Sequence, residues 1–212
     1  MTLLNRVASQ QGRRDQTPNQ DLARELTMEE DQAGIREIAE NLWNKDRNIQ
    51  SNCLKVLYEI GYSRPELIAD YVGDFLELLS SKKNRLIWGS MIALSTIATI
   101  KAHDIYPHVE EIVTLMDRGS VITQDNAVKV LTALASSDEN YRDTIFPSLL
   151  KHLENCRPKD VPQHAESTVI AVDAASRDDF IRVLESRMDL MSPTQASRIK
   201  KVIKQVRSRS TA

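Results

Sequence analysis

The chain has 212 residues, of which 41% are hydrophobic and 27% charged, and its formal net charge is −2. This length supports a core without disulfides or metal ions, while six glycines, seven prolines and 5% aromatic residues disfavour a fold of many short strands. The only cysteines are Cys53 and Cys156, and no signal-peptide pattern opens the sequence, so we expect an all-helical protein in the reducing cytoplasm.

The N-terminal segment is polar, with little apolar content after Leu4 and Val7. Residues 1–19 are therefore expected to form a mobile tail. The sequence Thr27-Met-Glu-Glu30 has the form of a capping box, which predicts a capping helix over residues 28–46. Its apolar face would hold Ile35, Ile38, Ala39, Leu42 and Trp43.

An internal repeat follows this helix. Segments beginning at Cys53, Ser90 and Ala127 match one another at an offset of 37 residues, and a weaker copy begins at Ala165. Each of the first three segments reads small, apolar, any residue, apolar, Leu, and is followed by a second apolar stripe at helical spacing. The period therefore covers two helices. The small residues are expected where neighbouring helices must approach within about 8–10 Å.

The predicted domain runs over residues 20–206 as one unit. It contains repeats over about 48–83, 84–119, 120–159 and 160–193, a C-terminal capping helix over 194–206 and a tail over 207–212. Candidate N-caps are Asn48, Asn84, Ser120 and Asp160, and Gly61 and Gly119 suit helix ends. The uncharged stretch 86–100 is shorter than the roughly 20 residues of a membrane span, so it is predicted to be a buried helix.

These paired helices resemble HEAT or armadillo-type repeats over about residues 48–193. The resemblance implies an all-α right-handed α–α superhelix, a solenoid of about four HEAT-like helix pairs with terminal capping helices. The chain departs from the commoner HEAT form, in which an Asp and an Arg recur in the turn and second helix. The resemblance therefore leaves HEAT and armadillo subfamilies open.

Motifs that carry chemistry are scarce. No glycine-rich nucleotide loop is present. His152 and Cys156 lie one helical turn apart, but no further ligand is close in sequence, so neither a metal nor another cofactor is expected. His103, Asp104 and His108 could suggest acid–base chemistry, but the histidines would point to different helix faces, and capping explains Asp104. We predict no catalytic residue and no enzyme activity.

One enzyme family uses this architecture, the HEAT-like alkylpurine DNA glycosylases, which work with tryptophans, an Asp and an Arg on a basic concave face. Trp43 and Trp88 are the candidates here, but both are assigned to apolar core stripes. The net charge also disfavours a groove that neutralises phosphates. A nucleic-acid-binding or HEAT-like DNA glycosylase or repair function is kept as the alternative.

The first functional hypothesis concerns a group of acidic residues in the first repeat. Glu66, Asp70, Asp74 and Glu77 are spaced by four, four and three residues, which predicts a continuous acidic ridge on one helix. If second helices line the concave side of the stack, this ridge faces the partner. We therefore predict a non-enzymatic scaffold or adaptor that binds a partner segment on its curved surface, with a basic segment as the candidate. The alternative is an ordinary solvated helix face. The residues assigned to protein binding are Glu66, Asp70, Asp74, Glu77, His108 and Glu111.

Basic residues gather at the opposite end of the chain. Residues 187–212 carry a net charge of +6, which leaves −8 for the remainder. Lys200, Lys201, Lys204 and Arg207 are candidate polyanion contacts, although cations also stabilise a helix C-terminus. The expected partner is a protein, with nucleic acid disfavoured and no membrane contact.

Overall fold

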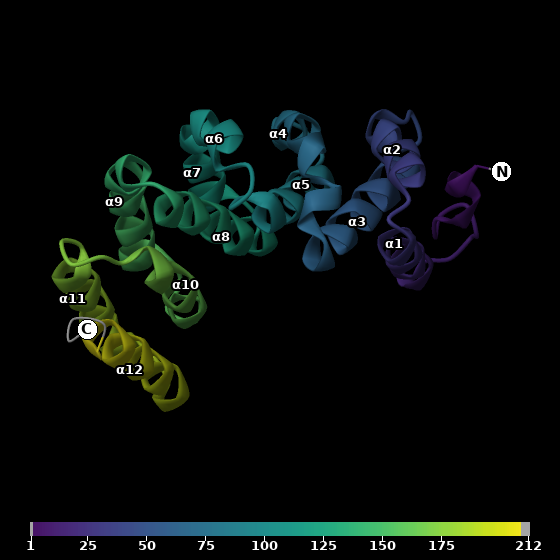
Figure 1. The fold of residues 1–212 in the computed structure, drawn as a ribbon. Helices are drawn as coiled ribbons and strands as arrows, with labels where there is room; N and C mark the ends of the chain where they lie inside the picture. Colours follow the sequence, from purple (N-terminus) through teal and green to yellow (C-terminus); the bar gives the residue numbers. More distant parts are fainter. Residues whose placement is uncertain (1, 209–212) are drawn as a thin grey trace. The chain divides into compact units, whose positions relative to one another are not determined.

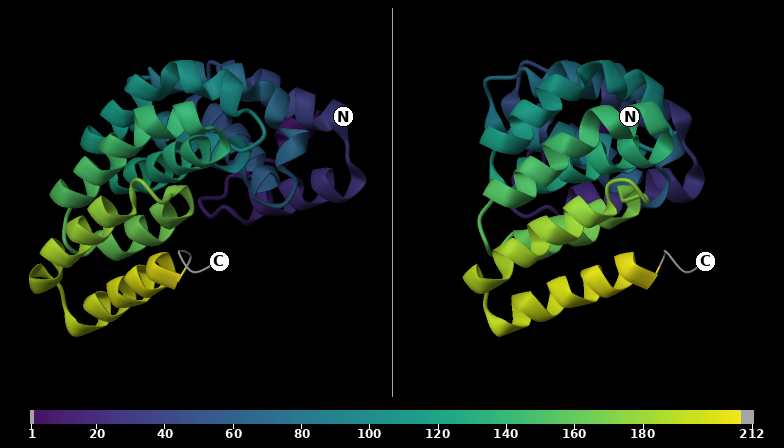
Figure 2. Two further views of the ribbon diagram at one scale, coloured as in Figure 1. Left: turned by 60° about the vertical axis from the view of Figure 1, so that its left-hand side comes forward. Right: turned by 90° about the vertical axis from the view of Figure 1, so that its left-hand side faces the viewer.

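The computed structural model describes residues 2–208, which form helices and turns without a β-strand (Figure 1, Figure 2). The chain divides into two compact units, Met1–Ile105 and Tyr106–Ala212. This division falls within the second predicted helix pair, and the single domain over residues 20–206 stays a prediction. No helix of the described residues is long and apolar enough to span a membrane.

Unit 1 has two layers of helices (Figure 1). Its elements are η1 (Leu3–Arg6), α1 (Thr17–Glu29), α2 (Gln32–Glu40), η2 (Asn41–Trp43), α3 (Arg47–Ser63), η3 (Pro65–Leu67), η4 (Ala69–Tyr71), α4 (Val72–Leu79), α5 (Asn84–Ile97) and α6 (Ala102–Ile105). Helix α3 packs against α1 on one side and α5 on the other, so these three helices form one layer. Helices α2 and α4 form the other layer, packed against α3 and α5 respectively.

The N-terminal segment is packed rather than a free tail, which corrects the prediction for residues 1–19 as far as the described residues go. Val7 and Ala8 are buried. The backbone N–H of Ala8 donates to Oδ1 of Asn19 at 3.0 Å, and the Asn19 amide donates to Oδ1 of Asn52 in α3 at 2.6 Å. Two apolar side chains and one satisfied amide network thus attach this segment to α1 and α3.

In unit 2, as in unit 1, the first helix of each predicted repeat alternates along the chain with the second helix. Its elements are η5 (Tyr106–His108), α7 (Val109–Arg118), α8 (Val121–Ser137), α9 (Glu139–Asn155), α10 (Val161–Thr168), η6 (Val169–Ala171), α11 (Arg177–Arg187), η7 (Met188–Leu190) and α12 (Pro193–Ser208). Helix α8 packs against α7, α9 and α10, and α12 packs against α10 and α11. Residues 209–212 of the predicted tail lie outside the described residues.

The core follows the repeat pattern. The four small repeat residues are all fully buried: Cys53, Ser90, Ala127 and Ala165. The apolar stripe of the C-terminal helix is buried as well: Ile199, Val202, Ile203 and Val206. Both sets lie on helices that pack side by side in one layer of their unit, which are α3 and α5 in unit 1 and α8, α10 and α12 in unit 2. Small or branched side chains at these positions let the helix axes approach. Each unit therefore buries the faces that a single helix pair would leave exposed.

Candidate binding sites

The four acidic residues of the predicted ridge lie on three successive elements rather than on one helix. Glu66 belongs to η3, Asp70 to η4, and Asp74 and Glu77 to α4. A 3₁₀ turn advances three residues per turn instead of 3.6, so a spacing of four no longer follows one straight line. The prediction of one continuous acidic ridge on a single helix is therefore wrong. The carboxylates nevertheless remain accessible, and the Asp70 side chain is 93% exposed.

Cations of unit 1 pair with two of these carboxylates. Arg64 pairs with Glu66, and this hydrogen bond lowers the pKa of the Glu66 carboxyl. Nζ of Lys101 lies 3.2 Å from Oδ1 of Asp70. Ion pairs exposed in this way contribute only about 0–1 kcal/mol. A cation from a partner can therefore replace Lys101 or Arg64 at little cost.

Trp43 is the residue of this surface that sequence reasoning assigned to the core. Leu42 beside it is fully buried, but Trp43 is 46% exposed and its indole N–H donates to Oδ1 of Asp74 at 2.8 Å. Helix α2 ends at Glu40, so the apolar register of the predicted helix does not continue to Trp43. An exposed indole face beside a carboxylate suits the side chain of lysine or arginine.

The acidic residues lie on the more open layer of unit 1. Helices α1, α3 and α5 pack against one another in succession, whereas α2 and α4 pack mainly on first helices. That second helices line the concave side stays a prediction. We call Trp43, Glu66, Asp70, Asp74 and Glu77 the Trp43–acidic surface.

The first-helix layer of unit 1 carries a separate groove between α1 and α3. It has a volume of about 610 Å³ and is lined in part by Met28, Glu59 and Tyr62. Met28 is 78% exposed and Tyr62 is 58% exposed. Tyr62 meets Tyr58 edge-on at 6.0 Å, and Tyr58 lies 6.3 Å from Trp88 between ring centroids. Trp88 is half-buried, so its predicted core role is only partly correct.

The remaining candidate protein contacts lie in unit 2. Nδ1 of His108 lies 3.8 Å from Oε2 of Glu111, one turn further along η5 and α7. The pair is partly exposed, and it belongs to a different unit from the Trp43–acidic surface. His103 and Asp104 lie in α6 of unit 1, so the histidines considered for acid–base chemistry are divided between the units.

The basic residues of α12 divide into paired and solvent-facing side chains. Arg198 donates to Glu166 at 2.6 Å and Arg207 donates to Glu185 at 2.9 Å, which ties α12 to α10 and α11. Arg207, which is one of the four candidate polyanion contacts, therefore already forms an ion pair within the chain. The other three lie on the exposed face of the helix: Lys200, Lys201 and Lys204.

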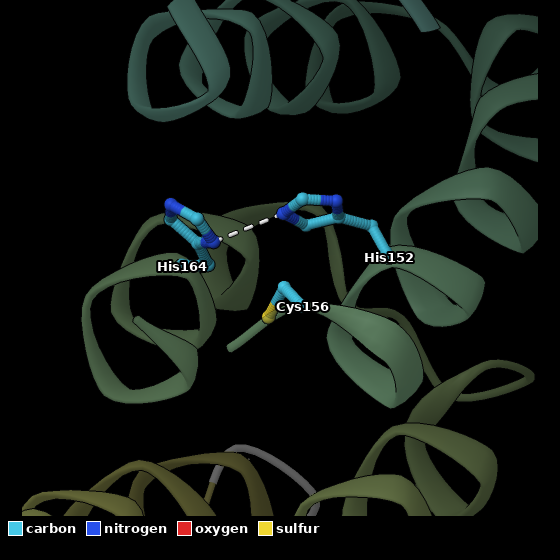
Figure 3. A group of neighbouring side chains, drawn as sticks. All are labelled: His152, Cys156 and His164. Carbon is cyan, nitrogen blue, oxygen red and sulfur yellow. Dashed lines mark hydrogen bonds between the residues drawn. The ribbon is translucent and has the colours of Figure 1, made fainter. Parts of the chain in front are cut away.

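A cluster of metal-ligand residues lies between α9 and α10 (Figure 3). His152 comes from α9, Cys156 follows the end of that helix, and His164 comes from α10. Nε2 of His152 and Nδ1 of His164 are 3.0 Å apart and share a hydrogen bond. The nearest ligand atoms of all three residues lie within 4.8 Å of one another. No third ligand was expected from the residues close in sequence to His152 and Cys156, and helix packing brings His164 to them.

Two carboxylates flank this cluster. Nε2 of His164 lies 2.8 Å from Oδ1 of Asp125, and Nδ1 of His152 lies 3.9 Å from Oδ1 of Asp117. Burial, followed by the neighbouring His164, lowers the pKa of His152 to about 4. Burial raises the pKa of the Cys156 thiol to about 11. Near neutral pH the His152 ring is therefore neutral and the thiol protonated.

Comparisons with known proteins agree with this architecture. No protein-family model matches the chain, and no curated protein sequence matches it. Among solved structures, an engineered protein is similar with a TM-score of 0.69 and 18% identity, covering 91% of this chain and 90% of that one. A designed armadillo repeat protein in complex with the peptide (KR)4 has a TM-score of 0.69 and 13% identity, covering 88% and 92%.

A further set of computationally designed armadillo repeat proteins for modular peptide recognition includes a structure with a TM-score of 0.68 and 13% identity, covering 89% of this chain and 91% of that one. At such low identity these likenesses concern the fold alone. Together with the helix pairs and the buried repeat residues, they show that the chain has an all-α helical-repeat fold of the HEAT/armadillo type.

Proposed function

We propose that this protein is a non-enzymatic scaffold or adaptor that binds a basic, extended segment of a partner protein on the Trp43–acidic surface. The contact between the exposed Trp43 indole and the Asp74 carboxylate carries this proposal. It is supported by the designed armadillo repeat protein of the same fold that is in complex with the peptide (KR)4. The cytoplasmic location stays a prediction from the sequence.

The physical basis is a sum of weak contacts. A lysine or arginine over an exposed indole contributes about 0.5–1 kcal/mol, and each exposed ion pair a similar amount or less. One cationic side chain would bind too weakly to be retained. A segment with several cations can engage Trp43, Asp70 and Glu77 together, and each added contact requires no second loss of translational freedom. We therefore expect a preference for multiply charged segments over single cations.

His108 and Glu111 are proposed as a further contact of the partner, on unit 2. They are kept as part of the proposal because their carboxylate and imidazole are partly exposed, at 36% and 42% of the side chain.

The test is isothermal titration calorimetry of the full chain with the peptide (KR)4 and with an acidic peptide of the same length. We expect binding of the basic peptide only, and a loss of at least about tenfold in affinity in the Asp70→Lys/Asp74→Lys variant, because like charges repel. Lys200→Gln/Lys204→Gln is the control and should bind the peptide as the wild type does.

Two results would contradict the proposal. One is unchanged affinity in the Asp70→Lys/Asp74→Lys variant. The other is a loss of affinity in Tyr62→Ala instead, which would place the peptide in the α1–α3 groove, where Tyr62 is exposed.

The second candidate function is nucleic-acid binding through α12, favoured by its exposed Lys200, Lys201 and Lys204. It predicts affinity for duplex DNA that falls steeply with salt and decreases in the Lys200→Gln/Lys204→Gln variant. Indifference to duplex DNA at low ionic strength would rule this function out and leave the protein-binding proposal unaffected.

A further inference from the structure

We propose that His152, Cys156 and His164 form a binding site for a divalent transition-metal ion, with zinc as the preferred ion. The three residues belong to two helices and face one another in unit 2 (Figure 3). The site does not rest on the proposed protein-binding function, because its three residues belong neither to the Trp43–acidic surface nor to the His108–Glu111 pair.

The ligand set determines the class of ion. Two imidazole nitrogens and one thiolate are borderline to soft ligands, which favour zinc, cobalt or copper over magnesium and calcium. Tetrahedral zinc with bonds of about 2.0–2.3 Å needs ligand atoms about 3.3–3.7 Å apart. The histidine nitrogens are 3.0 Å apart and the ligand atoms of all three residues lie within 4.8 Å. Side-chain movements of about 1 Å therefore suffice to close the site.

The outer contacts are those of a metal-binding histidine. His164 is almost fully buried and directs Nδ1 towards the cluster, while Nε2 lies 2.8 Å from Oδ1 of Asp125. A carboxylate that accepts from the second ring nitrogen fixes the tautomer and orientation of a ligand histidine and makes it a better donor. Asp117 lies on the corresponding side of His152, at 3.9 Å from Nδ1. Asp125 is therefore proposed as a positioning residue.

The cluster is open on one side, which allows an ion to enter. A pocket of about 570 Å³ reaches the cluster at His152 and Cys156, and Asp117 and Lys151 also line it. A water molecule from this pocket can serve as the fourth ligand, since three protein ligands leave one tetrahedral position open. The thiol loses its proton when the sulfur–metal bond forms, so binding releases about one proton to the solvent.

Metal binding would link α9 to α10. His152 and Cys156 belong to the end of α9, and His164 to α10. The His152–His164 hydrogen bond, which joins these helices now, would be replaced by two bonds to one ion. An ion that binds only the folded chain stabilises it by mass action, so we expect the unfolding temperature to rise with metal concentration.

The test begins with full-length protein treated with a chelator and then titrated with Zn²⁺ and Co²⁺. We expect one equivalent of Zn²⁺ to bind with release of about one proton. Co²⁺ should give the visible spectrum of a tetrahedral site together with a thiolate-to-cobalt charge-transfer band. Failure to bind either ion, or a Co²⁺ spectrum without the charge-transfer band, would overturn the proposal.

Variants locate the site. Cys156→Ser and His164→Ala should each weaken Zn²⁺ binding by more than about 100-fold, and Asp125→Ala by about 10–100-fold with the Co²⁺ spectrum retained. Cys53→Ala is the matched thiol control, because Cys53 lies fully buried in α3 of unit 1, and this variant should bind as the wild type does. Equal Zn²⁺ affinity in the wild type and in a folded Cys156→Ser variant would show adventitious binding and overturn the assignment.

Discussion

Gly61 lies inside α3, on the side that faces α5. A Cβ atom at this position would collide with Oγ1 of Thr96 and lie 2.8 Å from Cδ1 of Ile68. The sequence suggested that Gly61 closes a helix, but α3 continues to Ser63. The glycine is needed because the helices approach closely there, and not because of a left-handed backbone.

We predict that Gly61→Ala lowers the free energy of unfolding by about 1–3 kcal/mol, because the added methyl group forces Thr96 or the helix axis to move. Gly73→Ala in α4 is the control, since a Cβ there would meet no atom within 4 Å. It should stabilise the protein by up to about 1 kcal/mol through helix propensity. Urea denaturation measures both changes, and equal effects of the two variants would contradict this account.

Asp173 lies in the turn between η6 and α11, and its contacts explain why an aspartate is present there. Its carboxylate accepts from the Ser176 hydroxyl at 2.6 Å and backbone at 2.8 Å, and Nη1 of Arg142 lies 2.6 Å away. The Ser176 hydrogen bond, with the further bond from Arg142, lowers the pKa of Asp173 to about 2. These contacts of Asp173 hold the turn that precedes α11.

The lowered pKa predicts a pH-dependent contribution. Because the folded pKa lies below the ordinary aspartate value of 3.8, the Asp173 carboxylate stabilises the fold above about pH 4, and this stabilisation is lost as the pH falls towards 2. Asp173→Asn should cost about 1 kcal/mol near neutral pH, and the difference from wild type should shrink over that acid range. Asp178→Asn, at an exposed position, is the control. A difference that stays constant from pH 7 to pH 2 would refute the assignment.

Local capping signals were predictable only in part. Ser120 caps α8 as predicted, by accepting from the backbone of Thr123. The predicted capping box at residues 27–30 is wrong, because Thr27 lies inside α1 and its hydroxyl donates to the carbonyl of Ala23. Asp31 caps α2 instead. Helix α1 extends through these four residues because it is held by its packing against α3. A four-residue pattern carries no information about that packing.

At the scale of elements, Arg187 joins α11 to the end of α9. It is 8% exposed and donates to the backbone carbonyls of Leu153 at 3.1 Å, of Glu154, and of Cys156 at 2.6 Å. The last carbonyls of a helix lack partners within the helix and carry partial negative charge. A buried guanidinium is therefore stable here, because it satisfies the C-terminus of α9.

We predict that Arg187→Met lowers the free energy of unfolding by about 2–4 kcal/mol, because it leaves buried carbonyl groups without donors. Arg182→Met on the same helix is the control, since the Arg182 side chain is 74% exposed, and its effect should stay within about 0.5 kcal/mol. Chemical denaturation compares the two. A loss in Arg182→Met as large as that in Arg187→Met would contradict the capping role.

The second helices show where periodicity fails at this scale. Helical spacing of apolar residues predicted one second helix in the first repeat, and the buried positions Leu67, Phe75 and Leu78 agree with that spacing. The chain nevertheless forms η3 and η4 before α4 begins at Val72. Apolar spacing reports which side chains are buried, and a 3₁₀ turn can bury almost the same positions as an α-helix. The exposed acidic residues therefore do not share one helix face, although the buried side chains are those that the spacing predicted.

At the scale of the whole molecule, the repeat spacing predicted the all-α fold and its first-helix core correctly. The division at residues 105 and 106 was not predictable, because the repeat pattern continues across it. The third residue of the metal-ligand cluster was not predictable either, since His164 meets His152 only through the packing of α10 on α9. Periodicity predicts which helix faces are buried, but it does not predict which particular side chains of two helices meet.

The central functional claim is tested most directly by the fluorescence of Trp43. The chain has two tryptophans, so Trp88→Phe leaves Trp43 as the only indole. We predict a saturable change in its emission on addition of the peptide (KR)4, with an affinity that falls as salt increases and a further loss in Asp74→Asn. Binding of the peptide with no change in Trp43 emission, or no binding at low ionic strength, would contradict the account.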